Sequence, residues 1–249
     1  MQPTGLIETI KVVNGKPMLF LLHLNRLRNG FSILNFPFSE SEIRNAIENF
    51  ISTNLIQNKE EETQAFRLRM EIHPSINREI YFNFSFSKLE DANYTWQEQG
   101  LPILPYLLQQ KKIDTFSILK HTDRKIYNDA LNYAKLNLCA DAFVFNENNT
   151  LADACIYNVF MIKNNKIYTP PLSDAPVAGV MRAFLLNNFP EIEEKSISIQ
   201  ELYQADELFV SNAIRGIRWV SHFGEQVYDN KKTKKLFHLF LNFINDEKM

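Results

Sequence analysis

The sequence has little of several features that mark particular classes of protein. It has only 2 cysteines, Cys139 and Cys155, and they lie far apart without a CxxC spacing, so we expect reduced core thiols in a cytoplasmic protein. The 5 histidines are scattered, which gives no metal-ligand cluster. No apolar run approaches the roughly 18 residues that span a membrane. A net charge of −2 leaves no basic surface for nucleic acid.

Glycine is also scarce, at 7 residues, so each glycine is expected to have a backbone role. Asn14-Gly15 predicts a hairpin turn between strands at 6–13 and 17–22. Alternating apolar residues predict further strands at 66–72 and 80–86, joined by a turn at 73–77, and Ser39-x-x-Glu42 is a capping box that predicts a helix.

The second half of the chain predicts a different set of elements. The proline-punctuated stretch 97–115 reads as a connection. Beyond it we expect a helix to about residue 138, strands at 142–145, 158–162, 166–168 and 206–210, a helix from Gly179 and a closing amphipathic helix. The pattern predicts an α+β protein with a small N-terminal α/β domain at 1–108, a linker at 109–115 and a larger C-terminal domain at 116–249.

Four features of the chain fit one chemistry. Lys120 lies between an apolar run and a helical pattern, and desolvation at such a junction lowers the pKa of an amine so that it can form a Schiff base. Asp153 lies in a largely apolar segment, where a carboxylate needs a partner. Gly179 precedes a helix whose free amides favour an anion, and Arg26 can grip phosphate. A reactive lysine, a carboxylate and an anion site together are what pyridoxal phosphate (PLP) requires.

Each residue also has an ordinary structural interpretation when it is taken alone. Most lysines are solvated surface charges, Asp153 could cap a helix or turn, and Arg26 could form a surface salt bridge. Tyr127, on the helix after Lys120, is compatible with the core or with a site. The argument for a cofactor therefore rests on the order of the motifs along the chain.

That order resembles the class IV aminotransferases, which are PLP enzymes of fold type IV with a D-amino acid aminotransferase-like fold. The matching segments run nearly the length of the chain: Glu8-Thr9-Ile10, His23-x-x-Arg26-Leu27, Leu119-Lys120-His121, Asp141-Ala142-Phe143-Val144, Asn158-Val159-Phe160, Tyr168-Thr169-Pro170-Pro171, Gly179-Val180-Met181-Arg182 and Ser211-Asn212-Ala213. Each match is short, but their shared order and spacing identify the family.

The resemblance implies a role for each matching residue. Lys120 would be the Schiff-base lysine and the proton shuttle, and Asp153 would face the ring nitrogen. The remaining cofactor contacts would come from Arg26, Asn158, Val180, Met181, Asn212 and Ala213. The resemblance also implies a homodimer that acts on a small-molecule amino substrate, with no metal.

The chain departs from the family pattern at two places. Asp153 stands where the family usually has glutamate, and its shorter side chain would grip the ring nitrogen less firmly and leave it less fully protonated. Many relatives have an Arg-Gly loop at the substrate site, where this chain reads Glu71-Ile72-His73-Pro74-Ser75. A substrate carboxylate would then need another partner, or the substrate differs.

Three functions stay open from the sequence. Lys120-His121 followed by Arg124 resembles the K-H-x-x-R pattern of aminodeoxychorismate lyase, which releases pyruvate and 4-aminobenzoate in the folate pathway. A transaminase of branched-chain or D-amino acids needs the same lysine. A PLP-binding relative without turnover would fit the two departures.

Overall fold

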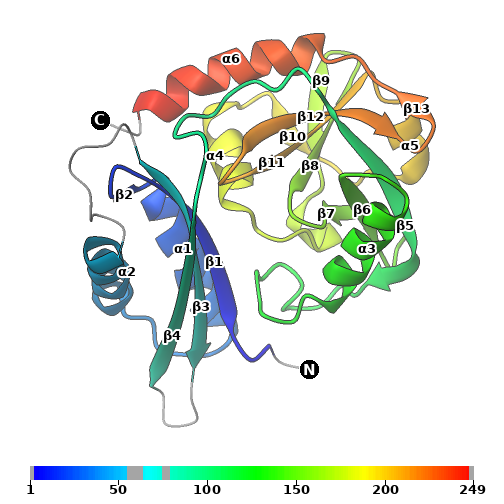
Figure 1. The fold of residues 1–249 in the computed structure, drawn as a ribbon. Coiled ribbons are helices and arrows are strands. Elements are labelled where there is room, and N and C mark those ends of the chain that lie inside the picture. Colours follow the sequence, from blue (N-terminus) through cyan, green and yellow to red (C-terminus); the bar gives the residue numbers. More distant parts are fainter. Residues whose placement is uncertain (1–2, 55–63, 75–78, 247–249) are drawn as a thin grey trace. The chain divides into compact units, whose positions relative to one another are not determined.

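The structure is a computed structural model that describes residues 3–54, 64–74 and 79–246. The chain divides into two compact units, drawn in Figure 1: Met1–Thr95 with Leu119–Asp123, and Trp96–Ile118 with Arg124–Met249. The segment that carries Lys120 thus belongs to the first unit, although its sequence neighbours belong to the second. The predicted domain boundaries at residues 108 and 116 differ from this division, because the chain passes from one unit to the other more than once.

The first unit is an antiparallel sheet with two helices. The strand order is β2-β1-β3-β4, and the elements are β1 (Leu6–Val13), β2 (Lys16–Pro17), α1 (Phe20–Ile33), α2 (Glu40–Asn54), β3 (Ala65–Pro74) and β4 (Ile80–Lys88). The predicted alternation in β3 is confirmed, since Leu68, Met70 and Ile72 are fully buried. Helix α2 packs on β4 through Phe50, whose ring stacks on that of Phe84.

The prediction of a second strand at 17–22 is wrong. Asn14 and Gly15 do form the predicted turn with positive φ angles, but β2 ends at Pro17. Leu19 then takes a left-handed conformation (φ 54°, ψ 34°) and precedes α1. The apolar run therefore continues as a helix, whose buried face includes Leu24 and Leu27. The predicted turn at 73–77 lies largely outside the described residues.

The second unit contains a larger mixed sheet. Its order is β10-β9-β8-β11-β12-β5-β6-β7, with β13 paired to β12. The strands are β5 (Leu101–Lys111), β6 (Asp141–Asn146), β7 (Leu151–Ala154), β8 (Asn158–Lys163), β9 (Lys166–Thr169), β10 (Ile192–Glu194), β11 (Glu207–Asn212), β12 (Gly216–Phe223) and β13 (Gln226–Val227). The helices are α3 (Lys125–Leu136), a 3-10 turn at Leu172–Asp174, α4 (Val180–Asn188), α5 (Ile199–Tyr203) and α6 (Lys231–Asp246).

The stretch that was expected to be a connection is instead the long strand β5. Pro102 and Pro105 lack amide hydrogens and usually argue against a central strand, yet β5 pairs in parallel with both β6 and β12. Ile103 and Tyr106 are buried on it, and the apolar area that they remove from water favours the strand. The predicted linker at 109–115 therefore begins inside the sheet, because β5 runs as far as Lys111.

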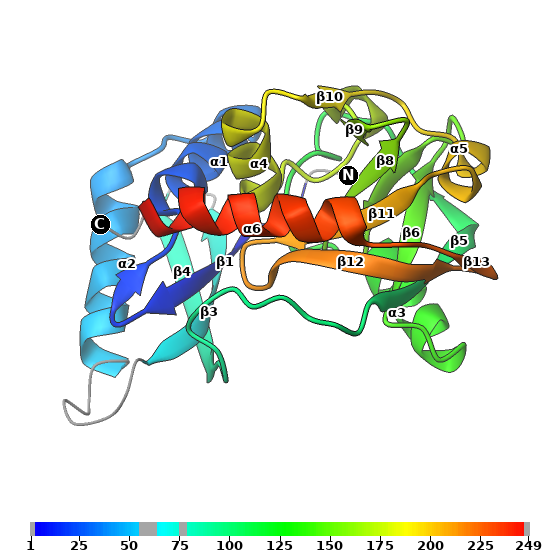
Figure 2. The ribbon, with the colours of Figure 1, turned by 90° about the horizontal axis from the view of Figure 1, so that it is seen from above.

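Helices cover the sheet of the second unit. Helix α3 packs on β5 and β6 with Tyr127, Ala130 and Ala134 buried. Helix α6 packs on β11 and β12, and Figure 2 shows it lying lengthwise beside them. Its buried side chains include Phe237 and Phe240. Among the described residues, no helix is long and apolar enough to cross a membrane.

Candidate functional site

In the first unit, a buried ion pair joins β1 to α1. Glu8 is 1% exposed. Its Oε1 accepts a hydrogen bond from Arg26 Nε at 2.8 Å, and its Oε2 accepts one from Arg26 Nη2 at 2.5 Å. His23 Nδ1 lies 2.5 Å from the same Oε2. His23 and Arg26 reach one carboxylate because residues three apart share a helix face.

These contacts decide the charge states of the cluster. Burial by itself would raise the pKa of Glu8, but the charges and hydrogen bonds of Arg26 and His23 outweigh it and lower the pKa from 4.5 to about 2. Burial lowers the pKa of His23, although the charge and the hydrogen bond of Glu8 act to raise it. Glu8 is thus an anion at neutral pH. Two nitrogens of Arg26, the predicted phosphate ligand, are engaged with this carboxylate.

Lys120 is also tied to β1. Its carbonyl oxygen accepts a hydrogen bond from the amide of Ile7 at 2.7 Å. Its half-buried side chain donates from Nζ to Thr9 Oγ1 at 3.1 Å. The next residue, His121, forms a bridge with Leu6. The backbone at Lys120 is therefore fixed against a strand, and its amine lies at a hydroxyl group.

In the second unit, Asp153 on β7 is the centre of a buried polar cluster and is 1% exposed. Its Oδ2 accepts hydrogen bonds from Tyr127 Oη at 2.7 Å, the Val177 amide at 2.9 Å and Lys111 Nζ at 3.1 Å. Its Oδ1 accepts one from Asn158 Nδ2 at 3.1 Å. Asp153 therefore does not cap a helix, and partners from four separate segments surround its carboxylate.

Lys111 is the member of this cluster that sequence reasoning missed. It ends β5, is 7% exposed and also donates to Ala175 O at 2.5 Å and to Tyr127 Oη. In the sequence it stands in the polar run Gln109-Gln110-Lys111-Lys112, and nothing distinguishes it there from a surface lysine. Only the pairing of β5 in the sheet brings it to Asp153.

Asn158 connects Asp153 to the start of α4. Its Nδ2 also donates to Val177 O at 2.8 Å. A Cβ added to Gly179, the N-cap of α4, would lie only 1.7 Å from Asn158 Oδ1. The amides of Val180 and Met181 lie in the first turn of α4, where no intrahelical acceptor exists. Only glycine allows the start of α4 to lie this close to Asn158. The free amides of this first turn favour an anion.

The segment Ser211-Asn212-Ala213 lies beside Asn158. Ser211 on β11 is the register partner of Asn158 on β8. Asn212 shapes the turn that follows, because its Oδ1 accepts from the amide of Arg215 at 2.8 Å and its Nδ2 donates to Ile156 O at 3.1 Å. Ser211 Oγ is buried and has no hydrogen-bond partner among the described residues. A buried hydroxyl in that state is expected to meet a ligand or water.

The structure therefore assembles the predicted residues into two groups, one in each unit. Arg26 and Lys120 both lie against β1 in the first unit. Asp153, Asn158, Val180, Met181, Asn212 and Ala213 lie around the ends of β7, β8 and β11 in the second unit. Arg182, from the same motif, has a structural role, since it donates to Pro170 O and pairs with Glu194.

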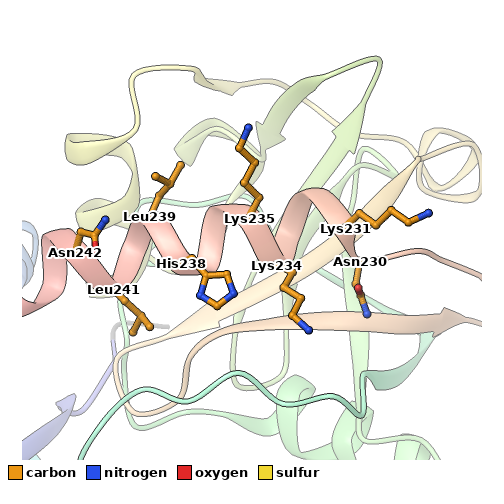
Figure 3. Close-up of a pocket in the computed structure, with 8 residues that line it drawn as sticks. All are labelled: Asn230, Lys231, Lys234, Lys235, His238, Leu239, Leu241 and Asn242. Carbon is orange, nitrogen blue, oxygen red and sulfur yellow. The ribbon is translucent and has the colours of Figure 1, made fainter.

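A surface pocket lies elsewhere in the second unit. It is lined by Asn230 and by side chains of α6, among them Lys234 and His238, drawn in Figure 3. It shares no residue with either group. Among the described residues, no group of three or more His, Cys, Asp or Glu side chains could hold a metal ion.

Comparison with known proteins finds a family model and several relatives that match this chain. The family described as "Amino-transferase class IV" matches residues 5–223. The chain is 24% identical over 227 residues to a "Probable branched-chain-amino-acid aminotransferase" of Thermotoga maritima, covering 89% of this chain and 78% of that one. It is 25% identical over 228 residues to aminodeoxychorismate lyase of Bacillus subtilis, covering 84% and 74%.

A solved structure extends the comparison to the fold. The 4-amino-4-deoxychorismate lyase of Pseudomonas aeruginosa superposes with a TM-score of 0.78 at 22% identity, covering 96% of this chain and 90% of that one. Likeness at this identity shows the fold alone, which is that of the fold type IV enzymes. The expected α+β class is confirmed.

The residues of the second unit fit the cofactor that this family uses, which is PLP. The first turn of α4 and the unpartnered Ser211 hydroxyl suit a phosphate group. The Oδ1 of Asp153 carries one donor whereas Oδ2 carries three, so Oδ1 retains acceptor capacity for a ring N–H.

Proposed function

Because the chain belongs to the class IV aminotransferase family, whose members are PLP-dependent enzymes, we propose that it is an aminodeoxychorismate lyase-like enzyme. The reaction converts aminodeoxychorismate to pyruvate and 4-aminobenzoate, a folate precursor. The observation that carries this choice is the Lys120-His121-x-x-Arg124 pattern, which resembles the lyase branch. The B. subtilis and P. aeruginosa relatives bear the lyase name.

Each residue has a defined task in this proposal. When bound, PLP supplies an electron-withdrawing ring that stabilises negative charge on the substrate carbon beside nitrogen. Lys120 Nζ would hold the aldehyde carbon of the cofactor and would carry a proton between substrate atoms. The amides of Val180 and Met181 in the second unit would bind phosphate, and Arg26 in the first unit is the other residue that the family pattern assigns to phosphate. Asp153 would face the ring nitrogen through its Oδ1.

Arg124 is the last residue of the lyase pattern, and two contacts hold its side chain in place. Its guanidinium carbon lies 4.5 Å from the centre of the Tyr127 ring, and its Nη2 donates to Cys155 O at 2.6 Å. A planar cation fixed on an aromatic ring suits recognition of a carboxylate. We assign it as the candidate partner for a substrate carboxylate, which the missing Arg-Gly loop would otherwise bind.

Two other functions each have a specific observation in their favour. The T. maritima relative is named as a branched-chain aminotransferase, which favours amino transfer to a keto acid such as 2-oxoglutarate. The closed cluster around Asp153 favours a PLP-binding relative without turnover, since Lys111 already pairs with that carboxylate.

The first test is the visible absorbance spectrum of the purified protein with PLP. We expect a Schiff-base band in the wild type that is lost in Lys120→Ala and retained in Lys125→Ala. Lys125 is a matched control, because its side chain is 77% exposed and pairs with the nearby Asp129 on the same helix. No band in the wild type, or a band that survives Lys120→Ala, would overturn the assignment of the lysine.

The second test separates the reactions. Protein loaded with PLP is given aminodeoxychorismate, and pyruvate is followed through lactate dehydrogenase. Release of pyruvate with 4-aminobenzoate supports the lyase. Amino transfer to 2-oxoglutarate without pyruvate release supports the transaminase. No reaction with aminodeoxychorismate and no amino transfer to 2-oxoglutarate supports the relative without turnover.

The expected homodimer and cytoplasmic location belong to the same proposal. Leu107 and Leu108 on β5 are 63% and 70% exposed, and Leu136 and Leu138 at the end of α3 are 84% and 91% exposed. Exposed apolar residues of this kind support an interface. Both cysteines are free, as expected in a reducing compartment.

A further inference from the structure

Arg215 and Arg218 are neighbouring arginines of the second unit that no carboxylate neutralises. Arg215 lies in the turn between β11 and β12 and is exposed, and Arg218 is half-buried on β12. Neither forms an ion pair with a residue that the structure describes, and Arg218 Nε is buried there without a hydrogen-bond partner. Burial lowers the pKa of Arg218, and although Tyr157 opposes this effect, the charge of Arg215 adds to it. The two guanidinium groups therefore repel each other, which costs stability.

Tyr157 adds a further donor to these two arginines. Its Oη accepts a hydrogen bond from Arg215 Nη1 at 2.7 Å, and the guanidinium carbon of Arg215 lies 6.0 Å from the centre of its ring. Tyr157 is 5% exposed, and burial raises the pKa of its hydroxyl, so the proton stays on the oxygen at neutral pH. That proton has no acceptor within the described part of the chain. Donors that carry positive charge and lack an acceptor favour an anion.

The turn between β7 and β8 places this group beside the residues proposed for the cofactor. The backbone oxygens of this turn, 155–157, accept hydrogen bonds from Arg124 Nη2 at 2.6 Å and from Asn212 Nδ2 at 3.1 Å. Tyr157, at the end of the turn, holds Arg215. One short turn thus positions Arg124, which we assigned to a substrate carboxylate, together with the second pair of arginines.

Asp141 fixes this turn but does not neutralise the arginines. It is fully buried at the start of β6. Its Oδ1 accepts a hydrogen bond from the amide of Cys155 at 2.9 Å, and its Oδ2 accepts one from the amide of Ile156 at 3.3 Å. Burial raises the pKa of Asp141, and its hydrogen bonds go to amides rather than to either guanidinium group. The positive charge beside Tyr157 is therefore left for a ligand to balance.

We propose that Arg215, Arg218 and the Tyr157 hydroxyl bind a carboxylate of the amino substrate, and that this substrate carries two carboxylates. The inference rests on the proposed function and deepens it by naming the substrate class. The proposed reaction yields two acids, pyruvate and 4-aminobenzoate, so its substrate has two carboxylates to be bound. Arg124 takes one of them and the Arg215–Arg218–Tyr157 group takes the other. A branched-chain amino acid has a single carboxylate and leaves one of these sites without its ligand.

The first experiment measures the binding of 4-aminobenzoate and of aniline, which lacks only the carboxylate, to the PLP-loaded protein by calorimetry. Pyruvate is the third ligand, because it keeps the other carboxylate of the substrate. We expect Arg215→Gln and Arg218→Gln each to weaken the binding of 4-aminobenzoate or of pyruvate by about tenfold or more and to leave aniline unchanged. Arg28→Gln is the matched control, because its side chain is 51% exposed and pairs with Glu40.

The ligand that loses affinity identifies which carboxylate the group binds. Tyr157→Phe keeps the buried ring and removes the hydroxyl, so it should weaken the same ligand by a smaller factor. This variant also tests the inference if an arginine variant does not fold. Wild-type affinity for both acids in the folded variants overturns the inference, and so does an equal loss of affinity for aniline.

The second experiment follows the turnover of aminodeoxychorismate by the same variants. Loss of a contact that holds the substrate equally before and during reaction should raise KM by about tenfold or more and change kcat much less. A fall in kcat at unchanged KM overturns the inference. Urea unfolding separates a structural role, because loss of an unpaired charge should not destabilise the protein, whereas loss of a structural arginine should. A wild type that binds both acids but releases no pyruvate overturns the proposed lyase alone, so the two failures are distinguishable.

Discussion

Replacement of Glu8 by glutamine should destabilise the protein strongly at neutral pH. The change keeps the size of the side chain but removes its charge from a site that is 1% exposed. It thereby takes the carboxylate away from Arg26, whose side chain is 12% exposed. The pKa of Glu8 falls from 4.5 to about 2 on folding. At 1.36 kcal/mol per pKa unit, this corresponds to about 3 kcal/mol.

A second argument gives a similar magnitude. Removal of one partner of a buried ion pair costs about 3–5 kcal/mol, because the other charge stays buried. We therefore expect Glu8→Gln to lower the free energy of unfolding by about 3 kcal/mol, measured by urea unfolding at neutral pH with circular dichroism. Glu48→Gln is the matched control. Its carboxylate is 56% exposed and lies 4.0 Å from Arg44, so the loss should stay below about 1 kcal/mol.

The sign of the pH dependence follows from the direction of the shift. The folded pKa of Glu8 lies below its unfolded value, so its contribution is complete above pH 4.5 and is lost as the pH falls toward 2. The difference between the wild type and Glu8→Gln should therefore narrow below pH 4.5. A loss under about 1 kcal/mol at neutral pH, or a difference that does not narrow in acid, would refute the reasoning.

Two further substitutions test the packing of the second unit. In Gly179→Ala the new Cβ would lie 1.7 Å from Asn158 Oδ1, so Asn158 must move. We expect the free energy of unfolding in urea to fall by about 1–3 kcal/mol and PLP binding to weaken in an absorbance titration. Unchanged values for both would contradict the close approach. Phe209 is fully buried with its ring 4.6 Å from that of Phe160, so Phe209→Ala should lower the free energy of unfolding by about 3–5 kcal/mol. Leu138→Ala is the control, because that side chain is 91% exposed, and it should change the free energy of unfolding by no more than about 0.5 kcal/mol.

Local chemistry made much of the secondary structure predictable. The alternation of Leu68, Met70 and Ile72 predicted β3 because side-chain direction in a strand has a period of two. The turn at Asn14-Gly15 was predicted because asparagine and glycine tolerate positive φ, and both residues adopt it (50° and 76°). Such signals depend only on a few neighbouring residues, and the fold does not override them.

Predictions failed where long-range pairing outweighed a local signal. Pro102 and Pro105 indicated a connection, but strands on both sides of β5 supply pairing and burial that a single segment does not reveal. The apolar run after Pro17 was compatible with a strand or a helix, and packing of α1 decided between them. Short apolar runs are ambiguous in this way because both periodicities fit them.

By itself, the sequence determined the class of fold and the order of the motifs, and it named the residues that we propose to hold a cofactor. Only the tertiary structure decided which charges meet. Lys111 and Asp153 are 42 positions apart, and Glu8 and Arg26 are 18 apart, so no local pattern predicts either pair. An ion pair depends on distance and burial, and both are set when the strands and helices that carry the charges pack together.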